Sequence, residues 1–286
     1  MLTKLPPLAE VLQLLPDLVC IVDADGRLLF ASASCERILG YPPDEVIGRR
    51  IFDLIHPDDR EATIEQAMRT MQGDAQRNFR NRYLHRAGHS VDMLWSAHWL
   101  REHGVRIGVG REITELRRTE RELEHLANHD PLTGLANRHR LQQELPRAIA
   151  RAAHSGRSMS LVYLDLDGFK SVNDRAGHEA GDHTLREVAR LLQQGVRQGD
   201  LVARVGGDEF VVLLPGCGAE DADRVAQGLR ARLQGSAVVL PNGDTVRLDA
   251  SAGVACFPRD GEGPAQLIAH ADRAMYAGRH VRRQGD

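Results

Sequence analysis

Residues 201–215 read LVARVGGDEFVVLLP, with two apolar runs on either side of Gly206-Gly207-Asp208-Glu209. The apolar runs predict two strands, and the glycine pair between them predicts the tight turn of a hairpin. Glycines at such a tip also let a ligand approach the backbone closely. The two adjacent acids are either a solubilising turn or part of a functional site.

A second informative stretch, residues 159–185, reads MSLVYLDLDGFKSVNDRAGHEAGDHTL. Its apolar strand runs directly into Asp165, at the end of a strand where open α/β sheets place their ligands. Gly168 permits a turn, and the amides after it, together with Lys170, predict a cradle for phosphate oxygens. Asp165 and the pair Asp208-Glu209 should converge, and carboxylates without Cys or His favour Mg²⁺ or Mn²⁺. Paired metal ions of this kind stabilise the attacking and leaving oxygens of a nucleotidyl transfer.

Three polar residues follow in the same stretch, Asn173, His178 and Asp182. A carboxylate accepts hydrogen bonds from the N1 and N2 groups of guanine, and an amide can donate to its O6 or N3. Asn173 and Asp182 are therefore candidates for reading a purine. The structural alternative is that Asp182 is the N-cap of a helix beginning at His183.

In the first half of the chain, the sequence predicts two strands, then short helices, then three more strands. Residues 18–32 read LVCIVDADGRLLFAS, a hairpin that turns at Asp25-Gly26. Short helices follow, the longest running from His56-Pro57 to about Met71. Three further strands are predicted at residues 77–85, 90–100 and 105–113. In the middle strand Met93, Trp95, Ala97 and Trp99 share one parity, so all four can face one side.

Residues 111–128, REITELRRTERELEHLAN, contain neither Gly nor Pro and predict a helix. Its apolar positions Ile113, Leu116, Leu123 and Leu126 or Ala127 form a partial stripe, too short to establish a coiled coil. We place a connecting helix at residues 114–128, between one unit at 8–113 and another at 129–286. A helix that joins two domains can transmit a change of twist between paired chains.

Composition sets wider limits. A chain of 286 residues with 42% hydrophobic and 27% charged residues predicts two ordinary packed domains and excludes disordered or collagen-like classes. The net charge of −3 gives no reason to expect a nucleic-acid or membrane-surface partner. Four scattered cysteines and the lack of a long apolar run favour a cytoplasmic protein. Of 37 basic residues only Lys4 and Lys170 are lysine, which singles out position 170.

The first half resembles the PAS domain family. The segments LPDLVCIVDADGRLLFAS, ILGYPPDEVIG and HPDDR carry the likeness across residues 14–113. The resemblance implies a sensor domain with an antiparallel five-stranded sheet. Cys35 does not stand in a flavin-binding pattern, and Glu61–Met71 has no haem-binding His, so the PAS cofactor is unknown and we expect none. A dimerising or small-ligand module remains.

The second half resembles the GGDEF domain of diguanylate cyclases, a palm-like α/β fold. The motif at Gly206–Phe210 is joined by DPLTGLANR (130–138), DLDGFKSVNDRAGHEAGD and SAGVA (251–255), in order. The overall fold class is therefore α/β, or α+β. The family is a nucleotidyltransferase that condenses two GTP into cyclic di-GMP and pyrophosphate in a homodimer.

The resemblance assigns the metal site residue by residue. Asp165 matches the first metal ligand, and Leu166 would contribute its backbone carbonyl. Asp208 matches a metal ligand and the proposed base for the 3′-hydroxyl, and Glu209 would support a second metal.

The resemblance also assigns the substrate contacts. Asn173 and Asp182 match the guanine-reading residues, and His178 lies near the nucleotide. Lys170 would hold phosphate charge in the transition state.

Two further positions depend on the family's pattern. Arg197 and Asp200 match a product-binding motif that would inhibit the enzyme, since Arg can clamp guanine and Asp can accept from its edge. In the last helix Arg279 stands where relatives carry Lys, and Arg283 keeps the family's Arg, so both are predicted to bind phosphate.

Two alternatives to a regulated cyclase stay open at this point. A GGDEF domain can act without catalysis as a sensor of cyclic di-GMP or GTP, although such a domain would be expected to carry a damaged motif. The protein can also be a regulatory scaffold that acts through its PAS half and helix.

Overall fold

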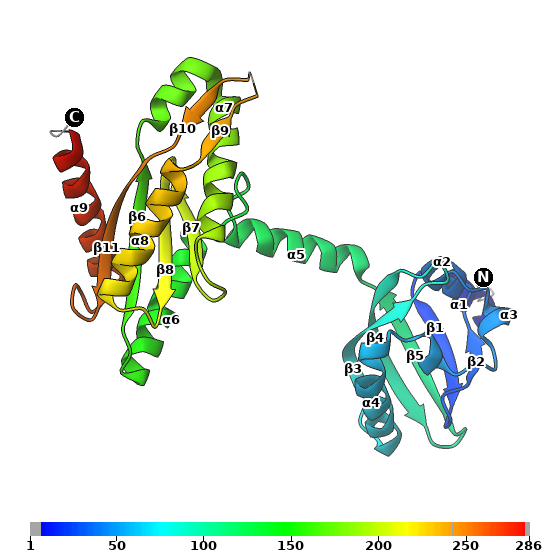
Figure 1. Cartoon of the computed structure of the whole chain (residues 1–286). Helices are drawn as coiled ribbons and strands as arrows, with labels where there is room; N and C mark the ends of the chain where they lie inside the picture. Colours follow the sequence, from blue (N-terminus) through cyan, green and yellow to red (C-terminus); the bar gives the residue numbers. More distant parts are fainter. Residues whose placement is uncertain (1–6, 242, 284–286) are drawn as a thin grey trace, which may run out of the picture. The chain divides into compact units, whose positions relative to one another are not determined.

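The protein is described here from a computed structural model that covers residues 7–241 and 243–283. The chain divides into two compact units, one ending at Arg121 and the other beginning at Glu122 (Figure 1). Both units mix helices with sheet, which confirms the predicted fold class. Within the residues described, no helix is both long enough and apolar enough to cross a bilayer.

The N-terminal unit is built on a five-stranded antiparallel sheet, as predicted, and the strands lie in the order β2-β1-β5-β4-β3. Its elements are α1 (Leu8–Leu14), β1 (Leu18–Asp23), β2 (Leu28–Ala31), α2 (Ser34–Leu39), α3 (Pro43–Val46), the 3₁₀ turns at Ile51–Leu54 and Pro57–Asp59, α4 (Arg60–Gln72), β3 (Gln76–Leu84), β4 (Ser90–Leu100) and β5 (Val105–Glu112).

Local side chains explain the first hairpin. Asp23 accepts hydrogen bonds at Oδ1 from the amides of Asp25 (3.0 Å) and Arg27 (2.8 Å). Gly26 takes φ +78° in the turn, a conformation that glycine adopts without strain. The predicted turn at Asp25-Gly26 is therefore confirmed.

The core of this unit lies on one face of the sheet. Met93, Trp95 and Ala97 of β4 are buried, and Trp99 is half-buried at the end of the same row. The shared parity of these four positions was predicted, and the structure confirms it.

Helix α5 (Thr114–Asn128) begins later than the charged run that predicted it. Arg111 and Glu112 pair with Leu94 and Met93 as the end of β5, so they are not helical. Pairing with the neighbouring strand outweighs the helical propensity of these two residues, in agreement with the strand predicted at 105–113. The domain limits at 113 and 129 stay predictions.

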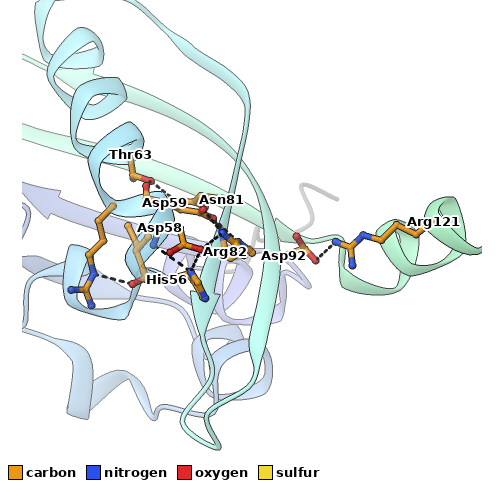
Figure 2. A network of polar contacts seen from close by, with 10 residues as sticks. His56, Asp58, Asp59, Thr63, Asn81, Arg82, Asp92 and Arg121 are labelled. Atoms are coloured by element: carbon orange, nitrogen blue, oxygen red, sulfur yellow. Dashed lines mark hydrogen bonds and ion pairs between the residues drawn. The ribbon is translucent and has the colours of Figure 1, made fainter. Parts of the chain in front are cut away.

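Asp92 of β4 ties the first turns of α5 to the sheet. Its amide donates to Thr114 Oγ1 (3.1 Å), and its carbonyl accepts from the amide of Ile113 (2.9 Å). Its carboxylate also accepts from Arg121 Nη2 (3.3 Å), one contact of the network in Figure 2. The start of the helix is thus fixed by one residue of the neighbouring strand.

The C-terminal unit contains a four-stranded sheet with the order β11-β6-β8-β7 and a separate two-stranded ribbon, β10-β9. Its elements, after the last turns of α5, are α6 (Arg138–Ser155), β6 (Met159–Leu166), α7 (Phe169–Gln194), β7 (Leu201–Gly206), β8 (Glu209–Pro215), α8 (Ala219–Gln234), β9 (Ala237–Val239), β10 (Thr245–Arg247), β11 (Ala250–Phe257) and α9 (Pro264–Arg283).

Helices cover both faces of this four-stranded sheet (Figure 1). Side chains of α7 and α8 pack with Val162 and Leu164 of β6, and side chains of α6 and α9 pack with Leu161 and Tyr163. Every residue of β6 is therefore buried. A strand that is covered on both faces usually carries apolar side chains along its whole length. Asp165 is an exception, and burial of its carboxylate costs free energy.

We expect the Asp59→Asn variant to weaken the N-terminal unit by about 1–3 kcal/mol at neutral pH. Arg82 grips the Asp59 carboxylate through Nε (3.0 Å) and Nη2 (2.6 Å), as Figure 2 shows. This hydrogen-bonded ion pair holds the pKa of Asp59 below its usual range. Its stabilisation is therefore present above the unfolded pKa of about 3.9 and is lost as pH falls through the lower folded pKa.

The variant should consequently lose less stability than the wild type when the pH is lowered toward about 3. Tryptophan emission during denaturant unfolding measures this unit alone, because Trp95 and Trp99, the two tryptophans of the chain, both lie in β4. The exposed Asp74→Asn change is the control. Equal pH dependence in wild type and Asp59→Asn would contradict the assignment.

Candidate active site

The centre of the candidate site is fixed by strand register. Asp165 on β6 lies directly opposite Glu209 on β8 and Ser251 on β11. Residues opposite each other in an antiparallel pair point to the same face, here the face covered by α6 and α9. The amide of Leu166 donates to the carbonyl of Asp208 (3.2 Å) at the hairpin tip. The four predicted metal-site positions therefore lie at one end of the sheet.

Arg279 of α9 provides the positive charge beside these acids. Its Nη1 donates to Asp165 Oδ1 (2.7 Å), and its Nε lies 3.1 Å from Asp167 Oδ1. The Nε–H is buried and not aligned for a hydrogen bond, so that contact is an ion pair only. Ser251 Oγ donates to the Asp167 carboxylate (3.0 Å) from the other side.

Asp167 and Ser251 were not among the predicted site residues. Asp167 follows Asp165 by two positions, and residues two apart on an extended chain point to the same side, so this spacing could have identified it. Ser251 belongs to the quoted segment SAGVA, but its place beside Asp165 depends on the β11–β6 register. That register is set by the whole sheet and has no local signature.

Burial and like charge make Asp165 unusual. Removal from water, followed by repulsion from Asp208, raises the pKa of Asp165 to about 6, and Arg279 works against this rise. Burial and the neighbouring Glu209 carboxylate raise the pKa of Tyr163 to about 12, so its phenol stays protonated. Tyr163, two residues before Asp165 on β6, is a further polar group that sequence reasoning missed.

The donor chemistry of the site suits a hard divalent cation. Asp165, Asp208 and Glu209 offer carboxylate oxygens, and Leu166 offers a backbone carbonyl. Burial first, and then the neighbouring carboxylates of Asp208, Asp167 and Glu209, disfavour the ionised form of Asp165, and a bound cation would offset both effects. As the side chains stand, the described residues contain no group of three or more His, Cys, Asp or Glu with ligand spacing.

Helix α7 carries the remaining predicted substrate residues. Gly168 turns the chain at φ +76° directly before the helix, and Lys170 is exposed in its first turn. Asn173 lies against Gly181, because a Cβ there would sit only 1.9 Å from Asn173 Oδ1. His178 is exposed, whereas Asn173 and Asp182 are half-buried.

The structural alternative for Asp182 is wrong. No helix begins at His183, because the break in α7 lies at Gly177 (φ +82°, ψ 169°) and Asp182 is inside the second helical part. Glycine adopts this non-helical conformation with positive φ without strain. The helix therefore breaks at Gly177 and does not start anew after Asp182. Asp182 is thus free of a capping role.

Two arginines outside the predicted set brace the hairpin tip. Arg204 donates from Nε to the carbonyl of Gly207 (2.9 Å) and from Nη1 to both oxygens of Asp130 (3.1 Å). Arg138 donates from Nε to the carbonyl of Val205 (2.8 Å). Asp130 and Arg138 are the ends of the quoted segment DPLTGLANR, so that segment holds the hairpin in place.

The predicted inhibitory residues form a separate corner. Asp200 stands before the first residue of β7, and the hairpin tip follows the last residue of that strand. Arg197 Nε contacts Asp200 Oδ1 (3.2 Å), and its Nη2 donates to the carbonyl of Pro215 (2.6 Å). The Arg197 side chain is 63% exposed, so its outer surface is open to a ligand. Arg283 ends α9, and its side chain lies outside the described residues.

Two family models match the chain. Residues 127–285 match the diguanylate cyclase GGDEF domain, and residues 8–111 match the PAS fold. The probable diguanylate cyclase DgcE of Escherichia coli is 33% identical over 271 residues, which are 92% of this chain and 24% of that protein.

Solved structures of GGDEF domains also match this chain. The GGDEF domain of TpbB from Pseudomonas aeruginosa is 39% identical with a TM-score of 0.52, covering 54% of this chain and 89% of that one. The coiled coil and GGDEF domain of DgcB from Caulobacter crescentus, in complex with c-di-GMP, is 28% identical with a TM-score of 0.55, covering 59% and 89%. The chain spans less than half the length of the curated relatives it matches.

We expect the Arg279→Met variant to make the C-terminal unit lose more stability as the pH rises from about 5 to about 8. Asp165 keeps its proton in the folded protein to about pH 6, whereas an unfolded aspartate loses it at about 3.9. Its ionisation therefore costs stability as pH rises through this window. Without Arg279 the pKa rises further, and each unit costs about 1.4 kcal/mol above the folded pKa.

Hydrogen–deuterium exchange of β6 at about pH 5 and about pH 8, corrected for intrinsic rates, measures this effect in the C-terminal unit. Arg273→Met, an exposed arginine on the same helix, is the matched control. If Arg279→Met and Arg273→Met lose equal protection between the two pH values, Arg279 does not compensate Asp165.

Proposed function

Because the chain belongs to the diguanylate cyclase GGDEF family and carries a PAS fold before that domain, we propose that it condenses two GTP molecules into cyclic di-GMP and pyrophosphate. The observation that carries the proposal is the register that sets Asp165 opposite Glu209, next to Asp208 at the hairpin tip. Acids that converge beside the N-terminus of a helix suit a nucleoside triphosphate with its cation.

In this proposal the strand-end acids hold Mg²⁺ or Mn²⁺ and prepare the attacking group. Asp165, the Leu166 carbonyl, Asp208 and Glu209 are the ligands. Bound metal would neutralise the charge of the phosphate oxygens. Asp208 accepts the proton from the 3′-hydroxyl of one GTP, and the oxygen attacks the α-phosphate of the other as the bond to pyrophosphate breaks. The same step in the reverse direction closes the ring and releases the second pyrophosphate.

Basic residues hold the triphosphate, and α7 reads the base. Lys170 contacts phosphate oxygens from the first turn of α7, and its exposure keeps it available. Arg279 and Arg283 of α9 add phosphate contacts. Asn173 and Asp182, on the two sides of the break at Gly177, bind the guanine edge, with His178 nearby.

Each copy of the chain binds one GTP, so two copies must face each other for the reaction. Helix α5 suits this role, because Leu116, Leu123 and Leu126 are each more than half exposed. In a homodimer these leucines would be covered by the partner's helix. The PAS domain then regulates the enzyme by changing how the two catalytic domains meet.

Product inhibition is proposed at Arg197 and Asp200. The DgcB structure contains c-di-GMP, which supports product binding in this family. In this chain the pair lies at the opposite end of β7 from the hairpin tip, so a ligand there would not fill the catalytic site.

The competing function is a non-catalytic sensor of cyclic di-GMP or GTP. None of the described contacts favours it: Arg204 and Arg138 hold the hairpin tip, and Asp165 lies opposite Glu209. GTP binding without turnover in the test below would support the sensor and contradict the cyclase.

We expect Asp208→Asn to lower cyclic di-GMP synthesis by at least about a hundredfold, because it removes a base and a charge at the reacting centre. The measurement is product formation from GTP and Mg²⁺ by the full chain, by chromatography, at several protein concentrations. The fold should survive, since the contact that Asp208 makes to Leu166 uses its backbone carbonyl.

Asp174→Asn is the matched control, because Asp174 is an exposed acid on α7 next to Asn173. It should keep wild-type activity. Turnover by Asp208→Asn within a few-fold of the control would remove Asp208 from the mechanism.

We expect Arg197→Ala to relieve inhibition by added cyclic di-GMP by about tenfold or more while sparing the initial rate, because it removes a bidentate donor of the second site. Inhibition curves with the purified product measure this. Arg224→Ala is the control, since Arg224 is likewise exposed and paired with an aspartate three residues away, Asp221. An Arg197→Ala curve that coincides with the wild type would exclude the second site.

A further inference from the structure

Asp167 lies beside the proposed metal ligands, and the proposed reaction gives it no role. Ser251 holds its carboxylate from one side, with a buried hydroxyl 3.0 Å from each of the two oxygens. The amide of Asp167 donates to the carbonyl of Asp249 (2.9 Å). The side chain and the backbone of Asp167 are therefore both fixed by the segment 249–251, where β11 begins.

On its other side Asp167 contacts the guanidinium of Arg279. The Nε atom of Arg279 lies 3.1 Å from Asp167 Oδ1, and the two side chains are only 25% and 28% exposed, so solvent screens their attraction less than at an open surface. The contact is not a hydrogen bond, because the buried Nε–H has no aligned acceptor. Charge attraction depends on distance and not on alignment. The guanidinium can therefore turn about Asp167 without breaking a hydrogen bond there.

The other end of the guanidinium is held by a directed contact. Nη1 of Arg279 donates to Asp165 Oδ1 at 2.7 Å, which is a charge-assisted hydrogen bond. Asp165 is also a proposed metal ligand, and a cation bound to its carboxylate would compete with Nη1 for the same negative charge. Asp167 is not a proposed ligand, so its attraction for Arg279 does not meet this competition.

We infer that Asp167 is a positioning residue, which keeps the guanidinium of Arg279 within reach of the triphosphate when Asp165 binds a cation. Ser251 serves the same end by fixing the Asp167 carboxylate. This inference rests on the proposed function, in which Arg279 is a phosphate contact. It adds Asp167 and Ser251 to the residues on which substrate binding depends.

The sign of one binding change distinguishes positioning from charge alone. A carboxylate beside a polyanion repels it, so removal of the Asp167 charge would by itself tighten the binding of a triphosphate. Positioning requires the opposite result. Without the Asp167 charge, Arg279 is held by Asp165 alone, and its contact with the triphosphate is weakened.

The test is a calorimetric titration of the full chain with 3′-deoxy-GTP in the presence of Mg²⁺. This analogue carries the triphosphate but lacks the hydroxyl that would attack, so binding is measured without turnover. We expect Asp167→Asn to bind the analogue about tenfold more weakly than the wild type. The variant should fold, because the contact with Asp249 uses the backbone amide. Asp174→Asn, which changes an exposed acid of α7, is the matched control and should bind like the wild type.

A double-mutant cycle separates positioning from a merely structural role. In the Arg279→Met background, Asp167→Asn should no longer weaken binding, because no guanidinium remains for it to hold. Ser251→Ala should weaken binding in the wild-type background, since it releases the Asp167 carboxylate, and should have no such effect beside Arg279→Met. General damage to this end of the sheet would weaken binding in both backgrounds.

The inference is overturned if Asp167→Asn binds the analogue as tightly as the wild type or more tightly, or if it weakens binding equally with and without Arg279. If Asp167→Asn does not fold, Ser251→Ala decides by the same comparison. A wild-type chain that binds the analogue but makes no cyclic di-GMP from GTP contradicts the proposed function and leaves this comparison intact. A wild-type chain that does not bind the analogue overturns both.

Discussion

The pairing of β6 with β8 is the constraint on which the C-terminal unit depends. It sets Asp165 opposite Glu209 and brings the amide of Leu166 to the carbonyl of Asp208. A slip of one residue would turn Asp165 to the other face, away from Arg279 and toward the apolar side chains of α7 and α8. The packed residues Leu161, Val162, Tyr163 and Leu164 oppose such a slip, so the same core that stabilises the fold positions the acids.

At this site one arginine lies beside two carboxylates, and the shape of its side chain suits that arrangement better than lysine would. The planar guanidinium of Arg279 reaches Asp165 and Asp167 with different nitrogens. A lysine ammonium is a point charge, and it would bridge two carboxylates less directly. The departure from the family's usual residue at this position therefore has a structural use in this chain. Lys170 lies exposed on another element and makes no comparable bridge.

Local chemistry made part of this structure predictable. The hairpins at Asp25-Gly26 and Gly206–Glu209 follow from turn residues between apolar runs, and the structure has both. The connecting helix placed at residues 114–128 coincides with α5, because the strand predicted before it takes up the first residues of the charged run. Asp167 and Ser251 were missed because cross-strand register brings them together.

Strand β4 connects the Trp95 indole with the start of α5. The Trp95 ring packs against Gly108 and Gly110 of β5, and Asp92, three residues earlier, holds the first turns of α5 through its backbone and its carboxylate. Three residues of strand span about 10 Å, and a strand within a sheet neither stretches nor shortens appreciably. The strand therefore keeps the Trp95 indole and the start of α5 at a fixed spacing, and the start of α5 cannot move along the sheet unless the indole moves with it.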